Sequence, residues 1–263
     1  MNILLGVLFA ILLHDVPYRL NAEDDYAQKF CTLDARFPDV HGFKTVVWLH
    51  DGGLTSGKKH FIGIDPRIGQ VSPDYRLLGR EGLKDGTECI RDAAAAVAWA
   101  LRHVSRYGGD VKKVYVAGMS AGGYLTMMVG MAPKYLAEYG FKPADLAGLA
   151  PVSGQATTHF NVRKFAGDGD PQFLPKIDDL APLRWVSADL PPIISICGEA
   201  PWEWKCRSEE NRLLIASCTA LGHRDARFVQ LPFADHELAF TCGVSYVELF
   251  IQGRIPPNLT VSR

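Results

Sequence analysis

The chain has 263 residues, 48% of them hydrophobic, and a formal net charge of −1 at pH 7. This size and composition predict one large globular domain with enough apolar residues for a substantial core. The balanced charge argues against binding to nucleic acid or to a strongly acidic surface.

The N-terminus carries an apolar run at residues 3–13, followed by the small residue Ala22. This pattern predicts a secretory signal peptide over residues 1–22, cleaved after Ala22, and a single domain over residues 23–263. The alternative is a structural N-terminal segment, which the lack of Lys and Arg before the run favours. Because the run is too short to span a bilayer, a secreted or periplasmic protein without a stable membrane span is expected.

Strand-like and helix-like segments alternate along the rest of the chain, which predicts an α/β fold: a mostly parallel central sheet with helices on both faces. The apolar, β-branched residues 45–49 (TVVWL) predict a buried strand. Residues 92–107 are alanine-rich, acidic at the start and basic at the end, which predicts a helix. Further strands are expected at residues 114–117, 146–152, 192–197 and 227–231, and further helices at residues 121–131, 207–221 and 244–252.

The segment Gly118-Met119-Ser120-Ala121-Gly122 stands between an expected strand and an expected helix. The pattern G-x-S-x-G alone is a weak signal, but a strand-to-helix turn is where α/β-hydrolases carry their nucleophilic serine. Glycine at positions 118 and 122 avoids side-chain clashes at such a strained turn. Ser120 is therefore the candidate nucleophile, and the alternative is an ordinary turn of small residues.

A serine nucleophile needs a histidine base and usually a carboxylate that orients the histidine, and in this fold the chain order is serine, acid, histidine. His236 fits because it follows the expected strand at residues 227–231, although a loop histidine can also cap a helix. Glu199 and Glu203 both follow the strand at residues 192–197. We prefer Glu203 for its reach to His236, with Glu199 as the alternative acid or as a brace for the loop. Asp235 should point away from its neighbour His236.

The tetrahedral intermediate of acyl transfer needs backbone N–H donors for its oxyanion. Ala121 follows the candidate nucleophile, and the loop after the first expected strand offers Gly52 and Gly53. Asp51 precedes these glycines, and a carboxylate close to an oxyanion would oppose the developing charge. Either the Asp51 side chain turns outward, or activity is reduced.

Several blocks in the same order are similar to one family. They are HDGGLTSGKK, SPDYRLL, DAAAAVAWALRHVSRYGGD, GMSAGGYLTMMVG, GLAPVSGQATTHF and CGEAPWEWKCRSEEN. Together they resemble the α/β-hydrolases of the feruloyl-esterase and carboxylesterase-like group, which includes the HGGG esterases and lipases. The resemblance implies an esterase fold and a triad of Ser120, Glu203 and His236.

The chain departs from this family at three places. Glu199 and Pro201 stand in a loop where many relatives carry an aspartate, so the acid is open between Glu203 and Glu199. Asp51 replaces the first glycine of the HGGG pattern. Residues 67–71 (RIGQV) are more polar than the central strand that should lead into the SPDYRLL block, so a bulge or a loosened strand is expected there.

The sequence thus predicts a serine hydrolase that cleaves small-molecule or carbohydrate-linked carboxylic esters through an acyl-enzyme, without a metal or organic cofactor. The alternatives are a catalytically weak binding protein of the same fold and a serine peptidase. The side chains of Trp202, Trp204, Phe160 and His159 either line an aromatic acyl pocket or serve in packing.

The six cysteines lack the paired C-x-x-C spacing of a zinc site. Cys197 in an expected strand and Cys218 in an expected helix are predicted to be buried free thiols rather than parts of a disulfide framework. Their pairing stays open from the sequence alone.

Overall fold

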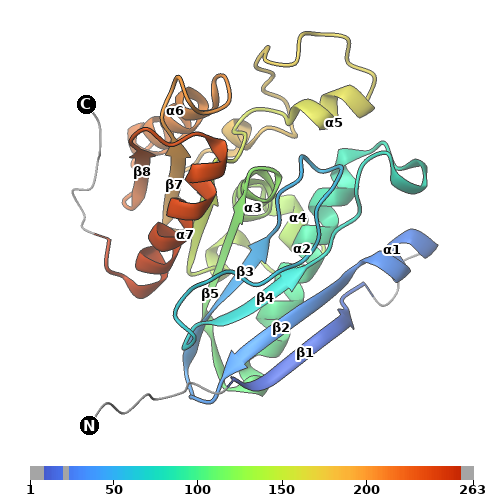
Figure 1. The fold of residues 1–263 in the computed structure, drawn as a ribbon, viewed down its shortest axis with the longest axis vertical. Coiled ribbons are helices and arrows are strands. Elements are labelled where there is room, and N and C mark those ends of the chain that lie inside the picture. Colours follow the sequence, from blue (N-terminus) through green and yellow to red (C-terminus); the bar gives the residue numbers. More distant parts are fainter. Residues whose placement is uncertain (1–8, 20–23, 256–263) are drawn as a thin grey trace.

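A computed structural model describes residues 9–19 and 24–255. Its strands form one sheet in the order β1-β2-β4-β3-β5-β6-β7-β8 (Figure 1). Neighbouring strands from β4 to β8 run parallel, whereas β2 is antiparallel to both β1 and β4. The predicted mostly parallel sheet is therefore confirmed. The strands are β1 (Phe9–Pro17), β2 (Thr32–Pro38), β3 (Phe43–Leu49), β4 (Gly69–Pro73), β5 (Gly109–Met119), β6 (Gly148–Val152), β7 (Ile193–Gly198) and β8 (Ala226–Leu231).

Helices cover both faces of the sheet, as predicted (Figure 1). Successive residues of a strand point to opposite faces, so Val47 belongs to a core shared with α2, α3 and α6, and Val46 to a core shared with α7. The helices are α1 (Asp25–Phe30), α2 (Gly86–His103), α3 (Ala121–Met131), α4 (Pro133–Ala137), α5 (Phe160–Phe165), α6 (Arg207–Ala220) and α7 (His236–Gln252).

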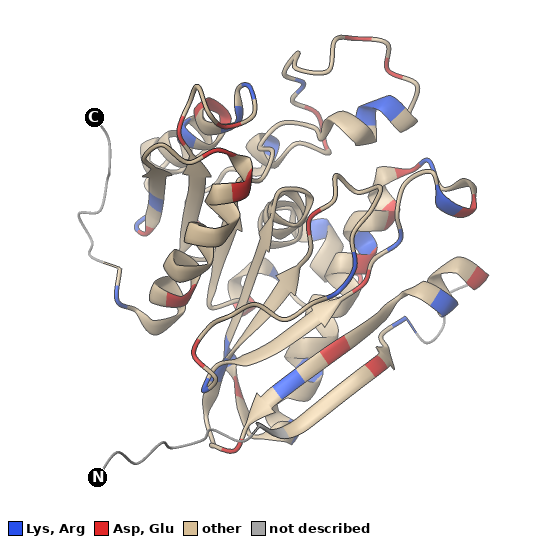
Figure 2. Ribbon diagram, viewed as in Figure 1, with Lys and Arg blue, Asp and Glu red and all other residues tan. Residues whose placement is uncertain are grey.

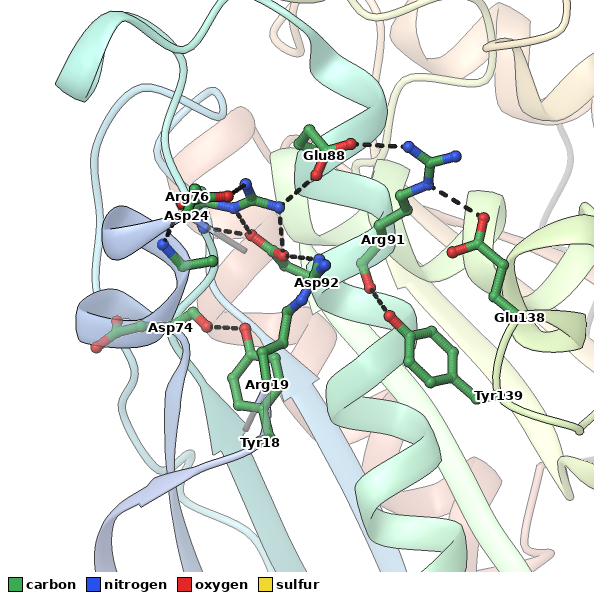
Figure 3. Close-up of polar contacts among 11 residues, drawn as sticks. Tyr18, Arg19, Asp24, Asp74, Arg76, Glu88, Arg91, Asp92, Glu138 and Tyr139 are labelled. Carbon is green, nitrogen blue, oxygen red and sulfur yellow. Dashed lines mark hydrogen bonds and ion pairs between the residues drawn. The ribbon is translucent and has the colours of Figure 1, made fainter. Parts of the chain in front are cut away.

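Two helices begin earlier than the sequence predicted. The α2 helix starts at Gly86 because the Asp85 side chain caps it, accepting a hydrogen bond from Thr87 N at 2.8 Å. Asp92, expected in the first turn of this helix, is fully buried inside α2 and binds Arg76 through a side-chain contact of 2.8 Å (Figure 3). The α7 helix likewise starts at His236, eight residues before its predicted beginning at residue 244.

The expected bulge or loosening at residues 67–71 is wrong. The β4 strand pairs with β2 and β3 without a register shift, and all of its residues are buried. Gln70 is tolerated there because its side-chain amide accepts from Ile62 N and donates to Ile62 O, both at 3.0 Å. At Gly69, a Cβ would lie 2.7 Å from the Phe43 ring, so only glycine allows this ring to pack directly against the β4 backbone.

The region of the predicted signal peptide contains an edge strand. Strand β1 pairs with β2, and the hydroxyl of Tyr18 donates to the backbone carbonyl of Asp74. Arg19 forms an ion pair of 2.6 Å with the buried Asp92 (Figure 3). Residues 1–8 and the predicted cleavage point after Ala22 lie outside the described residues. Cleavage there would remove β1 together with these contacts, and the signal peptide stays a prediction.

Basic and acidic residues are interspersed over the helices and strands (Figure 2). Within residues 9–19 and 24–255, no helix is long and apolar enough to cross a membrane. The six cysteines are free thiols, and Cys197 and Cys218 are buried as expected.

Candidate active site

Ser120 lies at the turn between β5 and α3, with φ 55° and ψ −111°. Non-glycine residues rarely adopt a positive φ, so this turn is strained and depends on its neighbours. A Cβ at Gly118 would lie 2.6 Å from the Gly122 backbone, and a Cβ at Gly122 would lie 1.9 Å from Leu49 O. Ser120 N donates to Val152 O at the end of β6, at 2.8 Å. The strand, strained turn and helix expected around Ser120 are thus present.

Glu203 is the carboxylate that contacts the candidate base. Its Oε1 accepts hydrogen bonds from His236 Nδ1 at 2.6 Å and from Trp204 N at 2.9 Å. Its Oε2 accepts from Ser153 Oγ at 2.6 Å and from Gly198 N at 3.1 Å. Only 5% of Glu203 is exposed, so these four donors replace the water that the carboxylate has lost.

These contacts fix the protonation of the pair. Burial raises the pKa of the Glu203 carboxyl, but the hydrogen bonds from His236 and Ser153 and the attraction of His236 outweigh it and lower that pKa to about 2. The carboxylate is therefore ionised at neutral pH and can only accept hydrogen bonds, so His236 Nδ1 carries the proton. In the neutral imidazole, His236 Nε2 is then the nitrogen that can accept a proton.

Glu199 braces the loop that carries His236. Its Oε2 accepts a hydrogen bond from Phe233 N at 2.7 Å, in the turn before α7. Asp235 caps α7, since its side chain accepts from Leu238 N at 2.8 Å. Asp235 thus points away from the Glu203 contact of its neighbour, as expected.

The loop after β3 carries the candidate oxyanion donors. Gly52 and Gly53 have φ values of 100° and 63°, which glycine adopts without strain. Within the part of the chain that the structure describes, the N–H groups of Gly52, Gly53 and Ala121 donate to no protein acceptor. Asp51 is exposed, which agrees with the outward orientation expected of its side chain.

Hydrogen bonds connect the carboxyl ends of neighbouring strands across the site. Ser120 N is bound to Val152 O, and the next residue, Ser153, donates from its N to β7 at 2.7 Å and from its Oγ to Glu203. Glu203 in turn holds His236. Among the described residues, neither Ser120 Oγ nor His236 Nε2 forms a hydrogen bond. Bonds between a nucleophile and its base often tighten only when substrate binds.

Three of the four aromatic residues singled out in the sequence form a row that ends at the candidate base. The Trp204 ring lies 5.4 Å from the His236 ring, and the Phe160 ring lies 5.5 Å from Trp204. His159 stacks on Phe160 at 4.5 Å. Trp202 is 61% exposed and makes no ring contact with the described residues.

Two residues of the site were not predicted from the sequence. Ser153 is buried, has φ 45° and donates to Glu203. Its position directly after a predicted strand could have indicated it, because the carboxyl ends of parallel strands meet at one edge. Asn161 Nδ2 donates to Gly53 O at 2.7 Å, across 108 residues of sequence. No local sequence pattern predicts that contact.

A mostly parallel sheet, a serine at a strained strand-to-helix turn and a downstream carboxylate–histidine pair define a protein of the α/β-hydrolase fold. Solved structures agree with this fold. One described as a truncated carbohydrate esterase from gut microbiota has a TM-score of 0.70 and 16% identity, covering 94% of this chain and 96% of that one. A thermophilic esterase from Thermogutta terrifontis has a TM-score of 0.66 and 20% identity, covering 86% and 92%.

Sequence comparisons narrow the resemblance to esterases. The profile of the family described as BD-FAE matches residues 34–139. The probable carboxylic ester hydrolase LipM of Mycobacterium tuberculosis is 25% identical over 63% of this chain and 41% of its own length. Esterase LipI of the same organism is 32% identical over 35% of this chain and 30% of its own length. The chain spans less than half the length of these relatives. The predicted resemblance to the feruloyl-esterase-like group is confirmed.

Proposed function

We propose that this chain is a serine hydrolase that cleaves carboxylic esters through an acyl-enzyme, with Ser120, His236 and Glu203 as its triad. The observation that carries the proposal is the 2.6 Å contact between Glu203 and His236, which Ser153 connects to the strained turn at Ser120. The similarity to LipM and LipI supports the reaction class.

In the proposed mechanism, His236 Nε2 takes the proton of Ser120 Oγ as that oxygen attacks the ester carbonyl carbon. The carbonyl oxygen becomes an oxyanion, which accepts hydrogen bonds from the N–H groups of Ala121, Gly52 and Gly53. When the intermediate collapses, the alkoxide leaves with the proton from His236, and the acyl group stays on Ser120. A water molecule, deprotonated by His236, then attacks the acyl carbon; the bond to Ser120 Oγ breaks, Oγ takes the proton back from His236, and the carboxylic acid leaves. Each step is a proton or acyl transfer between these groups, the substrate and water, so the proposal includes no metal or organic cofactor.

The proposed substrate is a small-molecule or carbohydrate-linked ester. The aromatic row at His236 favours an aryl or other flat apolar group on one side of the scissile bond. A carbohydrate esterase is among the proteins of similar fold, which supports esters of sugars as candidates. We also propose, from the N-terminal apolar run, that the protein acts outside the cytoplasm.

A fluorophosphonate probe tests the nucleophile. The wild-type protein should be labelled, Ser120→Ala should not be labelled, and Ser105→Ala should be labelled like wild type because Ser105 is an exposed serine outside the site. Wild-type protein that stays unlabelled would overturn the proposal. A panel of aryl esters, alkyl esters, acetylated or feruloylated sugars and matched peptide amides then distinguishes an esterase from a peptidase.

A further inference from the structure

The loop that carries the candidate oxyanion donors has an unusual backbone. Gly52, Gly53 and Leu54 all have positive φ values, of 100°, 63° and 64°. Leu54 is fully buried and has a Cβ, so its left-handed conformation is strained. Such a conformation persists only where surrounding contacts hold it.

The carbonyl oxygens of this loop show which contacts hold it. Asp51 O accepts from His50 Nδ1 at 2.7 Å, and Gly52 O accepts from Ser56 N and Ser56 Oγ, both at 3.0 Å. His50 and Ser56 are close in sequence, and Asp51 O also accepts from the hydroxyl of Tyr75 at 3.4 Å. In a trans peptide the N–H points opposite to the C=O of the same unit, so these bonds direct the N–H groups of Gly52 and Gly53.

The next carbonyl is held from a distant segment. Gly53 O accepts from Asn161 Nδ2 at 2.7 Å, and a Cβ on Gly53 would lie 3.1 Å from the same nitrogen. Within the described residues, this is the hydrogen bond that ties the Gly52–Gly53 turn to α5. Leu54 O accepts from Leu78 N at 2.7 Å, so the C-terminal end of the strained stretch is held both by the segment after β4 and by α5.

Asn161 is itself held firmly. Its backbone N–H donates to His159 Nδ1 at 3.2 Å, at the N-terminus of α5. His159 is 1% exposed and lies between the rings of Tyr124 and Phe160, at 5.3 and 4.5 Å. Burial, with the charge of Arg207, lowers the pKa of His159 to about 3, so its ring is neutral and Nδ1 can accept.

From these contacts we infer that Asn161 is a positioning residue of the oxyanion hole. It fixes the peptide unit that joins Gly53 to Leu54 and so anchors the C-terminal end of the turn that presents the N–H groups of Gly52 and Gly53 to the oxyanion. It acts through the loop and does not touch the reacting atoms. This inference rests on the proposed function, because a hole matters only if an oxyanion forms.

Two variants test the inference. Asn161→Ala removes the donor, and Asn161→Asp places an acceptor against Gly53 O at neutral pH. Both should lower kcat by about 10-fold or more with KM within about twofold, since a misplaced oxyanion donor weakens the transition state more than the bound substrate. Lys164→Ala is the matched control, because Lys164 is exposed on the same helix, and it should behave like wild type.

The pH dependence separates positioning from general damage. In Asn161→Asp, the introduced carboxyl can donate to Gly53 O once it is protonated, so the activity of this variant relative to wild type should recover as the pH falls from about 8 to about 4.5. The ratio for Asn161→Ala should stay flat. A kcat within twofold of wild type for both variants, or identical pH profiles for both, overturns the inference.

Hydrogen–deuterium exchange gives a readout that needs no activity. Amide exchange over residues 50–57 should be faster in Asn161→Ala than in Lys164→Ala at equal thermal stability. If exchange is faster in Asn161→Ala but the wild-type protein lacks esterase activity, the proposed function fails and the role of Asn161 in holding the loop stands. Unchanged exchange in an active enzyme would overturn that role alone.

Discussion

Replacing Glu203 by glutamine tests the assignment of the acid most directly. The four donors to this carboxylate leave no good place for an amide NH₂ group. An amide nitrogen at the Oε1 position would face Trp204 N–H, and one at the Oε2 position would face Gly198 N–H. In either placement one buried N–H donor lacks an acceptor, and with the nitrogen at the Oε1 position His236 is driven towards the tautomer with a proton on Nε2, which cannot act as base. The corresponding carboxylate-to-amide change lowers kcat by about 10⁴-fold in a serine triad.

The same variant has a measurable effect on stability. The pKa of Glu203 falls from 4.5 to about 2, a difference that contributes about 3 kcal/mol to the free energy of unfolding at neutral pH. Because the folded pKa is depressed, this contribution is present above the unfolded pKa and is lost as the pH falls from about 5 to about 2. Urea unfolding should therefore show Glu203→Gln less stable than wild type at pH 7, and the difference should shrink below about pH 4.

Glu199→Gln is the matched control. Glu199 accepts one hydrogen bond, from Phe233 N, and a glutamine oxygen can accept it equally well. Its kcat should stay within about threefold of wild type. A large loss of kcat in Glu199→Gln, with Glu203→Gln nearly active, would refute the assignment of the acid.

Three further changes have defined outcomes. Asp51→Gly should leave kcat within about twofold in an ester assay, because the exposed carboxylate is screened by solvent; a rise above fivefold would show that Asp51 opposes the oxyanion. Ser153→Ala should cost about 1–3 kcal/mol in urea unfolding by removing a donor from the buried Glu203, and an unchanged midpoint would contradict that role. Deleting residues 1–22 removes β1 and the Arg19–Asp92 ion pair and should lower Tm by about 5 °C or more. N-terminal sequencing of protein recovered from an exporting host shows which N-terminus the cell keeps.

The parts of the fold that the sequence predicted are those with a local signature. Residues 45–49 of strand β3 are a continuous buried run that starts with three β-branched residues, and the turn at Ser120 is marked by glycine on both sides. The first two strands of the chain, β1 at the edge of the sheet and β2 beside it, lack such a signature. In β2 the buried residues alternate with the partly exposed Asp34 and Arg36. Such an alternation is typical of a half-buried strand, but a search for continuous apolar runs does not detect it. An apolar run such as β1 has the same composition as a signal peptide, and only its pairing with β2 reveals a strand.

The pattern of charges along the chain predicted a wrong helix start where the charged residue is buried. Asp92 looks like a first-turn acid, yet it lies inside α2 and binds Arg76, which also contacts Asp24 and Glu88 (Figure 3). A charge of this kind belongs to a network that comes together only after folding. The same limit applies to Asn161, whose partner is the backbone of a distant loop.

The choice between Glu199 and Glu203 shows why the sequence left two candidates. Both follow β7, and both lie in one turn, since Glu203 N donates to Glu199 O at 3.0 Å. The two carboxylates differ in the number of hydrogen-bond donors that surround them. A buried carboxylate is stable only where several donors replace water, and Ser153, on the neighbouring strand end, is the side-chain donor that completes the set around Glu203. The contact that favours Glu203 as the proposed acid therefore comes from the turn after β6, a segment fifty residues away, and sequence distance from the histidine could not reveal it.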